Sequence, residues 1–243
     1  MSPAPIDSPK PTEADSWQMF DRIARRYDFL NRLLSFRQDV AWRKRMIKRL
    51  PKGDSLAMLD LATGTGDVLI NVYRISKRIG VGVGLDMSAD MLERGRRKIR
   101  DLGVQGDLQL IRSNAMFMGL NDNSFDVATM SFGIRNVPDV PMALRDIHRV
   151  LKPGGRGMIL EFSIPGNAFI RTFYLFYFRH ILTRIGSIIS GDAQAYRYLN
   201  TTVESFPYGD AFVSLMSDAG FKHVEAVSLT FGIATLYIGD KES

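Results

Sequence analysis

The sequence predicts an α/β fold: a doubly wound, mostly parallel sheet of seven strands that ends in an antiparallel C-terminal hairpin. Short apolar runs alternate with segments of helical periodicity between residues 56 and 162, and that alternation is typical of parallel strands joined by helices. The first apolar run ends in a turn of small residues with two glycines, Gly64 and Gly66. Two apolar runs near the C-terminus are joined only by a short turn, so we expect them to pair as a hairpin at the edge of the sheet.

Each element carries a local signal. The spacing of apolar side chains predicts N-terminal helices at 17–34 and 39–50, and Pro51 and Gly53 stop the second. The strands are expected near 56–61, 81–86, 107–112, 126–132, 156–162, 221–229 and 233–238, with helices near 66–79, 88–101 and 139–151. A Lys-Pro-Gly-Gly turn at 152–155 is expected just before the fifth strand.

The composition is ordinary for a globular protein and excludes several chemistries. The chain has 243 residues, no cysteine and three widely spaced histidines, which rules out disulfides and thiol nucleophiles and argues against a metal site. The N-terminus lacks the basic head and apolar core of a signal peptide, so we expect a cytoplasmic protein. Residues 1–15 hold four of the ten prolines and are predicted to be a disordered tail, with a single domain at 16–243.

Two features leave alternatives open. The net charge of +6 is concentrated in basic runs at 43–49 and 94–100, which are either solvated helix faces or surfaces for an anionic membrane or nucleic acid. An insertion at about 163–220 is longer than a crossover needs, and its segment 169–190 mixes aromatic residues with arginines. That segment is either a core helix that caps the sheet or an apolar lid over a hydrophobic substrate, or both.

The glycine turn and the next strand predict an adenosine-containing cofactor. Glycines let a ligand approach the backbone closely, and Asp86 lies 86 − 66 = 20 residues beyond Gly66, the spacing of a carboxylate that binds a ribose diol. A dinucleotide fingerprint would need glycine at position 69, where Leu69 stands. Asp60 and Asp67 would repel a pyrophosphate but suit a cation. This favours S-adenosylmethionine over a dinucleotide, the alternative being an ordinary strand–helix turn.

Several further motifs resemble those of one family. The matching segments cover roughly residues 17–241 and lie at 20–28, 30–31, 34–36, 59–67, 84–88, 91–92, 122–126, 131–137, 149–155, 160–163, 196–199 and 206–207. Among them Phe-Gly-Ile-Arg-Asn at 132–136 and Tyr-Arg-Tyr-Leu at 196–199 are the most specific. The chain resembles the quinone-biosynthesis C-methyltransferases, the demethylmenaquinone and 2-polyprenyl-6-methoxy-1,4-benzoquinol methylases. The resemblance implies a class I, Rossmann-like methyltransferase with N-terminal helices and a helical lid.

By the same resemblance, the expected activity is S-adenosylmethionine-dependent C-methylation of a polyprenylated quinol, demethylmenaquinol to menaquinol, in menaquinone or ubiquinone biosynthesis. The residues that it implies as cofactor contacts follow the carboxyl ends of successive strands: Gly64, Thr65, Gly66, Asp86, Met87, Asn114, Ala115 and Ser131. The chain departs from the family after Asn114-Ala115, where an acidic residue and a proline usually follow. It reads Met-Phe-Met-Gly at 116–119, so we expect a more apolar rim around the adenine.

Ring methylation needs a group that stabilises a phenolate, since a phenol loses its proton with a pKa of about 10. Arg135 and Asn136, just past the fourth strand, are the expected catalytic residues, with His180 as a second candidate for general base. Tyr196 and Tyr198 are expected to flank the substrate. No metal is expected in the site.

Two other functions are compatible with parts of the sequence. A nucleic-acid methyltransferase is disfavoured for two reasons. Methylation of cytosine at C5 needs a cysteine nucleophile, and the chain has none. Enzymes that methylate exocyclic amines of bases usually carry Asp/Asn-Pro-Pro-aromatic after the fourth strand, where this chain reads Ser-Phe-Gly-Ile-Arg-Asn at 131–136. A non-catalytic member that binds the cofactor within a lipid-pathway complex, or an enzyme for another small aromatic, is the alternative. We also expect transient contact with the inner face of the membrane through 169–190 and 39–50. The sequence does not determine the head group of the quinol, the length of its isoprenoid tail, or whether the chain forms a homodimer.

Overall fold

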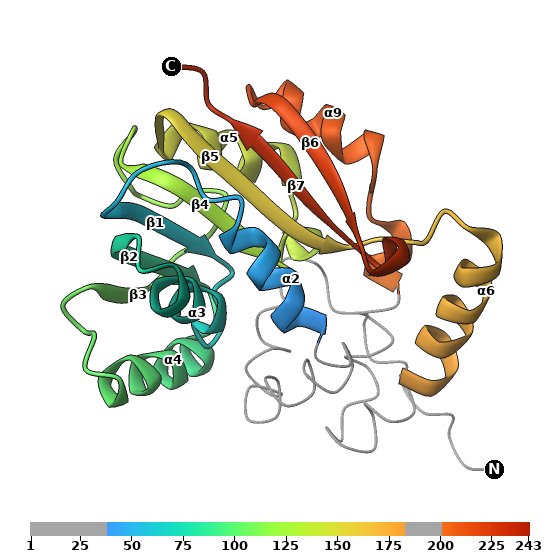
Figure 1. The fold of residues 1–243 in the computed structure, drawn as a ribbon, viewed down its shortest axis with the longest axis horizontal. Helices are drawn as coiled ribbons and strands as arrows, with labels where there is room; N and C mark the ends of the chain where they lie inside the picture. The colour runs from blue at the N-terminus through green and yellow to red at the C-terminus, as the bar shows by residue number, and fades with distance from the viewer. Residues whose placement is uncertain (1–37, 183–200) are drawn as a thin grey trace, which may run out of the picture.

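The computed structural model describes residues 38–182 and 201–243 (Figure 1). The expected tail at 1–15, the expected helix at 17–34 and the tyrosines Tyr196 and Tyr198 lie outside the described residues. Everything below concerns the described part of the chain.

A seven-stranded sheet forms the centre of the molecule, as predicted. Its strands are β1 (Leu56–Leu61), β2 (Ile79–Asp86), β3 (Leu108–Arg112), β4 (Phe125–Ser131), β5 (Leu151–Phe162), β6 (Lys222–Leu229) and β7 (Ala234–Asp240). Their order in the sheet is β3-β2-β1-β4-β5-β7-β6. The first five strands run parallel, and β7 lies antiparallel between β5 and β6. The doubly wound sheet with a C-terminal antiparallel hairpin is therefore confirmed.

Helices cover both faces of this sheet (Figure 1). On one face lie α2 (Gln38–Ile47), α3 (Asp67–Ser76) and α4 (Ala89–Asp101), whose apolar side chains share a core with β1, β2 and β3. On the other face lie α5 (Val140–Val150) and α9 (Asp210–Asp218), which pack with β4 and β5. The helices begin within a few residues of the expected positions, and Ser88 caps α4 by accepting a hydrogen bond from the backbone of Met91.

One strand begins earlier than the sequence predicts. The residues 152–155, expected as a turn before the fifth strand, lie inside β5 as an irregularity, because Phe125 pairs with Leu151 while Val127 pairs with Arg156. The backbone of this segment is held from the far end of the chain: Gly154 N donates to Lys241 O at 2.9 Å, and Lys241 N donates to Gly155 O at 2.8 Å. A local pattern of residues carries no information on such distant partners.

The insertion after β5 contains α6 (Ala168–Phe176), which continues as a π-helical turn, η3 (Tyr177–Leu182). One side of this segment is buried, with the rings of Tyr174 and Phe178 stacked at 5.4 Å. The other side presents Phe169, Phe173 and Phe176, which are 72%, 60% and 57% exposed. A search of the described residues found no helix long and apolar enough to cross a membrane.

Candidate active site

The carboxyl ends of β1 and β4 form the crevice of this fold. The two strands are neighbours in the sheet, with Leu61 opposite Met130. From β1 the chain continues to β2 on one side, and from β4 it continues to β5 on the other. Open α/β sheets bind their ligands at such a point, where the strand order reverses.

The glycine turn after β1 exposes its backbone to this crevice. Ala62, Gly64 and Gly66 all adopt a positive φ, of 48°, 57° and 76°, and the turn closes with a hydrogen bond from Gly66 N to Thr63 O at 2.9 Å. A Cβ atom placed on Gly64 would meet no heavy atom of residues 38–182 or 201–243 within 4 Å. The space beside Gly64 is therefore open, and a ligand can rest on the backbone there.

Asp86, at the end of β2, is brought directly to this turn. Its Oδ2 accepts a hydrogen bond from Gly64 N at 2.8 Å, and its Oδ1 accepts one from Ser88 N at 2.8 Å. These two bonds fix the orientation of the carboxylate. Because each carboxylate oxygen can accept more than one hydrogen bond, the same group is also suited to bind a ribose diol.

The two other acids of the turn differ in environment. Asp60 is 1% exposed and accepts hydrogen bonds from Thr63 and Thr129, both at 2.6 Å. Burial raises its pKa from 3.8 to about 6. Asp67, in contrast, lies 2.8 Å from Lys98 and 3.6 Å from Arg43, so its charge is balanced by two cations. Asp60 and Asp86 are thus the carboxylates here that favour a cationic ligand.

Other expected cofactor contacts lie at the same edge of the sheet. The Thr65 side chain is buried and accepts a hydrogen bond from Lys98 Nζ at 2.7 Å, so only its backbone is available to a ligand. Met87 O accepts from Arg112 Nε at 2.9 Å. After β3, Asn114 Oδ1 accepts from Met116 N at 2.9 Å, which closes the turn that also contains Ala115. Phe117 in this turn is 68% exposed, in keeping with an apolar rim.

Arg135 and Asn136 lie in a short 3₁₀-helix, η2 (Ile134–Asn136), just after β4. Arg135 is buried rather than on the surface. Its Nη1 donates to Glu161 Oε1 and to Phe132 O, both at 2.7 Å. Its guanidinium also lies 5.5 Å from the centre of the Phe162 ring. The arginine is therefore held in place by β5 and by the loop that carries it.

Arg135 and four other residues in the described part of the chain carry buried polar atoms that lack a hydrogen-bond partner. The five atoms are Ser131 Oγ, Arg135 Nε, Asn136 Oδ1, Glu161 Oε2 and Tyr174 Oη. Unpaired buried polar atoms are rare and costly, and they call for an explanation such as a missing ligand. We call these five residues the polar cluster. They come from β4, η2, β5 and α6.

Glu161 and Tyr174 are not among the functional residues predicted from the sequence. A signal for Glu161 was present, because it is a charged residue inside the apolar run Met158–Phe162 that predicts a buried strand. Tyr174 carried no comparable signal, since it is one of many aromatic residues in its segment.

Comparison with known proteins identifies the family. The model of the ubiE/COQ5 methyltransferase family matches residues 10–241. The chain belongs to this family. Among its relatives, a Syntrophotalea carbinolica protein named ubiquinone/menaquinone biosynthesis C-methyltransferase UbiE is 44% identical over 225 residues, 93% of each chain. An Escherichia coli protein of the same name is 40% identical over 92% of this chain and 89% of its own length.

Solved structures share the class I methyltransferase fold. A SAM-dependent methyltransferase from Aquifex aeolicus is similar with a TM-score of 0.58 and 17% identity, over 82% of this chain and 88% of that chain. Haemonchus contortus phosphoethanolamine N-methyltransferase 2, solved with S-adenosyl-L-methionine, has a TM-score of 0.62 and 14% identity, over 84% of this chain and 53% of that one. The chain is thus a methyltransferase by family, and its fold is that of the class I methyltransferases.

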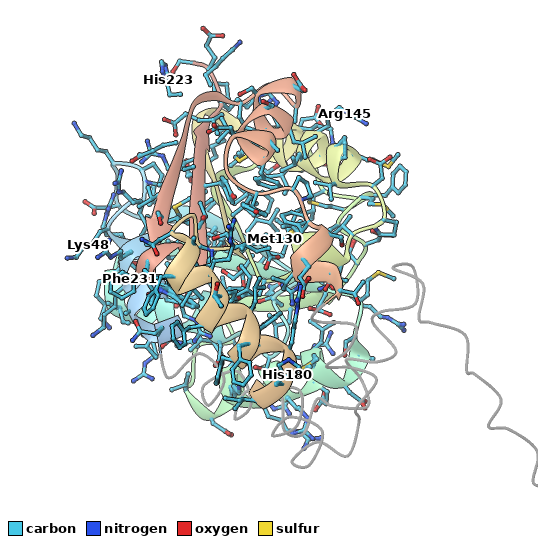
Figure 2. All side chains as sticks on the ribbon, turned by 90° about the vertical axis from the view of Figure 1, so that its right-hand side faces the viewer. Lys48, Met130, Arg145, His180, His223 and Phe231 are labelled. Carbon is cyan, nitrogen blue, oxygen red and sulfur yellow. The ribbon has the colours of Figure 1, made fainter. Side chains whose placement is uncertain are left out.

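The site of this family member has two halves. Gly64, Gly66 and Asp86 gather on one side, and Ser131, Arg135 and Asn136 on the other. His180, the second candidate for a general base, is exposed in η3, where its ring lies 5.1 Å from that of Phe176. Figure 2 shows His180 toward the lower end of the α6–η3 segment, below the label of Met130.

Proposed function

We propose that this chain transfers a methyl group from S-adenosylmethionine to a ring carbon of a polyprenylated quinol, demethylmenaquinol to menaquinol, in menaquinone or ubiquinone biosynthesis. The observation that carries the proposal is the 44% identity, over 93% of both chains, to a ubiquinone/menaquinone biosynthesis C-methyltransferase. The polar cluster beside the crevice supports it, because a quinol brings two hydroxyl groups that can pair with such atoms.

The residues of the first half of the site fit the proposed cofactor. Its ribose would lie on Asp86, its adenine by Asn114 and Ala115, and its methionine portion over the turn at 62–66, near Ser131. When bound, this cofactor supplies an electrophilic methyl group on a sulfonium. The open space beside Gly64 and the carboxylates of Asp60 and Asp86 support this placement, since they suit a cationic ligand without phosphate.

The second half of the site would hold the acceptor. A ring carbon becomes nucleophilic when the neighbouring hydroxyl loses its proton, so the enzyme must stabilise a phenolate oxygen in a dry environment. Arg135 is suited to this task because it is buried and its Nε still lacks a partner among the described residues. Asn136 Oδ1 adds an acceptor that can orient a second hydroxyl.

A quinone profile tests the proposed function. In a strain that lacks this protein, mass spectrometry of extracted lipids is expected to show quinones that are one ring methyl short, and complementation with the intact chain should restore them. The mass of the accumulated species also separates a naphthoquinol from a benzoquinol substrate. Unchanged quinones in the deleted strain would contradict the proposal.

We further propose that the enzyme docks reversibly on the anionic inner face of a membrane, where a polyprenylated substrate resides. Phe169, Phe173 and Phe176 offer an exposed aromatic face on α6. Lys44 in α2 and Lys48 just after this helix are exposed and offer positive charge. Arg43 does not belong to this surface, because its side chain is only 13% exposed and it pairs with Asp67. Basic residues near such a surface contribute about 1 kcal/mol each and are screened by salt.

Liposome flotation tests the docking. The intact chain is expected to float with anionic vesicles at low salt, and substitution of Lys44 and Lys48 by Glu should abolish flotation. Arg145 and Lys222, also exposed, are the matched control pair for the same charge reversal. Figure 2 shows Arg145 on the opposite side of the molecule from Lys48. Equal flotation of both double variants, or none by the intact chain, would contradict the docking.

A further inference from the structure

Only one oxygen of the Glu161 carboxylate accepts hydrogen bonds from the described residues. Its Oε1 accepts from Arg135 Nη1 at 2.7 Å and from Phe162 N at 2.8 Å. Its Oε2 has no partner in the part of the chain that the structure describes, although the whole residue is buried. A purely structural ion pair would be expected to satisfy both oxygens, because an unpaired buried carboxylate oxygen is costly.

Tyr174 brings a second unpaired group to the same place. Its hydroxyl is buried and lacks a partner among the described residues. Burial is the largest effect on the pKa of the Tyr174 hydroxyl and raises it. The Arg135 guanidinium lowers this pKa and the Glu161 carboxylate raises it, so both charges of the ion pair act on Tyr174. The helix α6 and strand β5 thus each contribute a buried, unpaired oxygen to the region around Arg135.

We propose that Glu161 Oε2 takes the proton from the ring hydroxyl of the acceptor, and that the Tyr174 hydroxyl binds the acceptor beside it. This inference rests on the proposed function, since it needs an acceptor with a phenolic hydroxyl. It assigns the role of general base to a buried carboxylate of β5 and not to His180 of η3.

The proton step balances without any further reactant. The O–H bond of the quinol breaks, its electron pair stays on the ring oxygen, and a new O–H bond forms on Glu161. After the ring carbon has gained the methyl group, it loses its own hydrogen as a proton, and aromaticity returns. The phenolate oxygen recovers the proton from Glu161, so one proton is released for each turnover and the carboxylate is regenerated.

The position of Arg135 makes this transfer electrostatically feasible. Before the step, the guanidinium is paired with the Glu161 carboxylate at 2.7 Å. Afterwards the negative charge lies on the ring oxygen, which the unpaired Arg135 Nε can bind. During this proton transfer the buried cation therefore keeps an anionic partner, first the Glu161 carboxylate and then the phenolate oxygen.

The environment of Glu161 is consistent with a base. Burial raises its pKa above the ordinary value, while Arg135 and the bond from Phe162 N lower it. A carboxylate with a raised pKa is a stronger base at neutral pH. Burial raises the pKa of Tyr174 in α6 and of Tyr237 in β7, and the Glu161 carboxylate raises both further, so both hydroxyl groups stay protonated at neutral pH.

Tyr174→Phe gives the sharpest test, and Tyr237→Phe is its matched control. Both tyrosines are buried, but the Tyr237 hydroxyl accepts a hydrogen bond from Gly209 N at 2.8 Å, whereas that of Tyr174 is unpaired among the described residues. Tyr174→Phe should keep or raise the melting temperature and weaken the binding of a short-chain demethylmenaquinol about tenfold. Tyr237→Phe should lower the melting temperature and leave that binding unchanged. Binding is measured anaerobically by calorimetry, without the methyl donor.

Glu161→Gln tests the proton transfer itself. Its kcat should fall at least about 100-fold, and the acid limb of the kcat–pH profile should disappear, while Glu161→Asp should retain that limb. Calorimetry with S-adenosylmethionine should give unchanged affinity for both variants. Retention of the acid limb in Glu161→Gln, or unchanged quinol affinity in Tyr174→Phe, would overturn the inference while leaving the proposed function intact. If the wild-type chain neither binds nor methylates a quinol, the proposed function itself fails, and this inference with it.

Discussion

At the scale of single residues, Asp86 holds the glycine turn and the start of α4 together through backbone bonds to Gly64 and Ser88. If the carboxylate also binds a ribose diol, its removal has a large effect on affinity. Asp86→Ala should weaken S-adenosylmethionine binding by about 3 kcal/mol, or roughly 100-fold, for the loss of two charge-assisted bonds.

Isothermal calorimetry measures this affinity, and Asp90→Ala is the control. Asp90 is an exposed acid in the first turn of α4, so its removal changes the net charge equally. The control should bind the cofactor as the wild type does. A folded Asp86→Ala chain with wild-type affinity would show that Asp86 only organises the turn.

Asp60 predicts a distinctive dependence of stability on pH. Because folding raises its pKa from 3.8 to about 6, the folded state binds the proton more tightly. The contribution of Asp60 to stability is therefore complete below the unfolded pKa and is lost as the pH rises through the folded one. This difference corresponds to at most ~3 kcal/mol.

Asp60→Asn removes that titration. The free energy of unfolding of the variant, minus that of the wild type, should grow by up to ~3 kcal/mol between about pH 4 and pH 7. Urea unfolding at a series of pH values measures the difference. A difference that stays constant with pH would mean that the Asp60 carboxyl is not perturbed by burial.

The residues of the site were predictable to the extent that they follow a local spacing. Asp86 and the glycine turn are linked by a fixed distance along the chain, and the sequence located both. The pairing of Arg135 with Glu161 joins η2 to β5 across 26 residues. No rule of sequence spacing predicts that contact. The unpaired polar atoms of Arg135 and Glu161 are likewise visible only in the three-dimensional structure.

At the scale of elements, α4 acts as a support for the glycine turn. Lys98, in its last turn, donates to Thr65 Oγ1 at 2.7 Å and to Asp67 Oδ1 at 2.8 Å. Lys98→Ala should therefore destabilise the fold by about 1–2 kcal/mol and lower cofactor affinity severalfold, because the turn loses its attachment.

Arg97→Ala provides the comparison within the same helix. Arg97 is 65% exposed and forms only a surface pair with Glu93 at 3.3 Å, which predicts a change within about 0.5 kcal/mol. Chemical unfolding and cofactor titration of both variants measure the effects. Equal stability of the two variants would remove the argument that α4 supports the turn.

The elements themselves were largely predictable, for identifiable reasons. Parallel strands buried on both faces are continuous apolar runs, so β1, β2 and β4 were located within two residues. The start of β5 was not predicted correctly, because its irregular segment is fixed by backbone hydrogen bonds with Lys241, which follows β7. For 169–190, α6 buries Tyr174 and exposes Phe173, so the described residues contribute both to the core and to the surface, and the lid over a substrate stays a prediction.

At the scale of the whole molecule, the strand order brings distant segments to one edge. The order β3-β2-β1-β4-β5 makes β1 and β4 neighbours, and Thr129 of β4 bonds to Asp60 of β1 across 69 residues. The turn proposed for the cofactor and Ser131, the last residue of β4 before the loop that carries Arg135, therefore lie at the ends of neighbouring strands, at one edge of the sheet. If the two proposed sites are right, this arrangement would hold donor and acceptor in contact, and proximity of that kind accounts for much of the rate of a transfer reaction.

The most direct test of this account is the transfer of a labelled methyl group. The purified chain is incubated with S-adenosylmethionine carrying a trideuterated methyl group and with short-chain demethylmenaquinol or its benzoquinol counterpart, and the products are fragmented in a mass spectrometer. We predict that the label is on a ring carbon of at least one product and that Asp86→Ala slows its formation. Label on an oxygen, or no labelled quinol from a chain that binds the cofactor, would contradict the account.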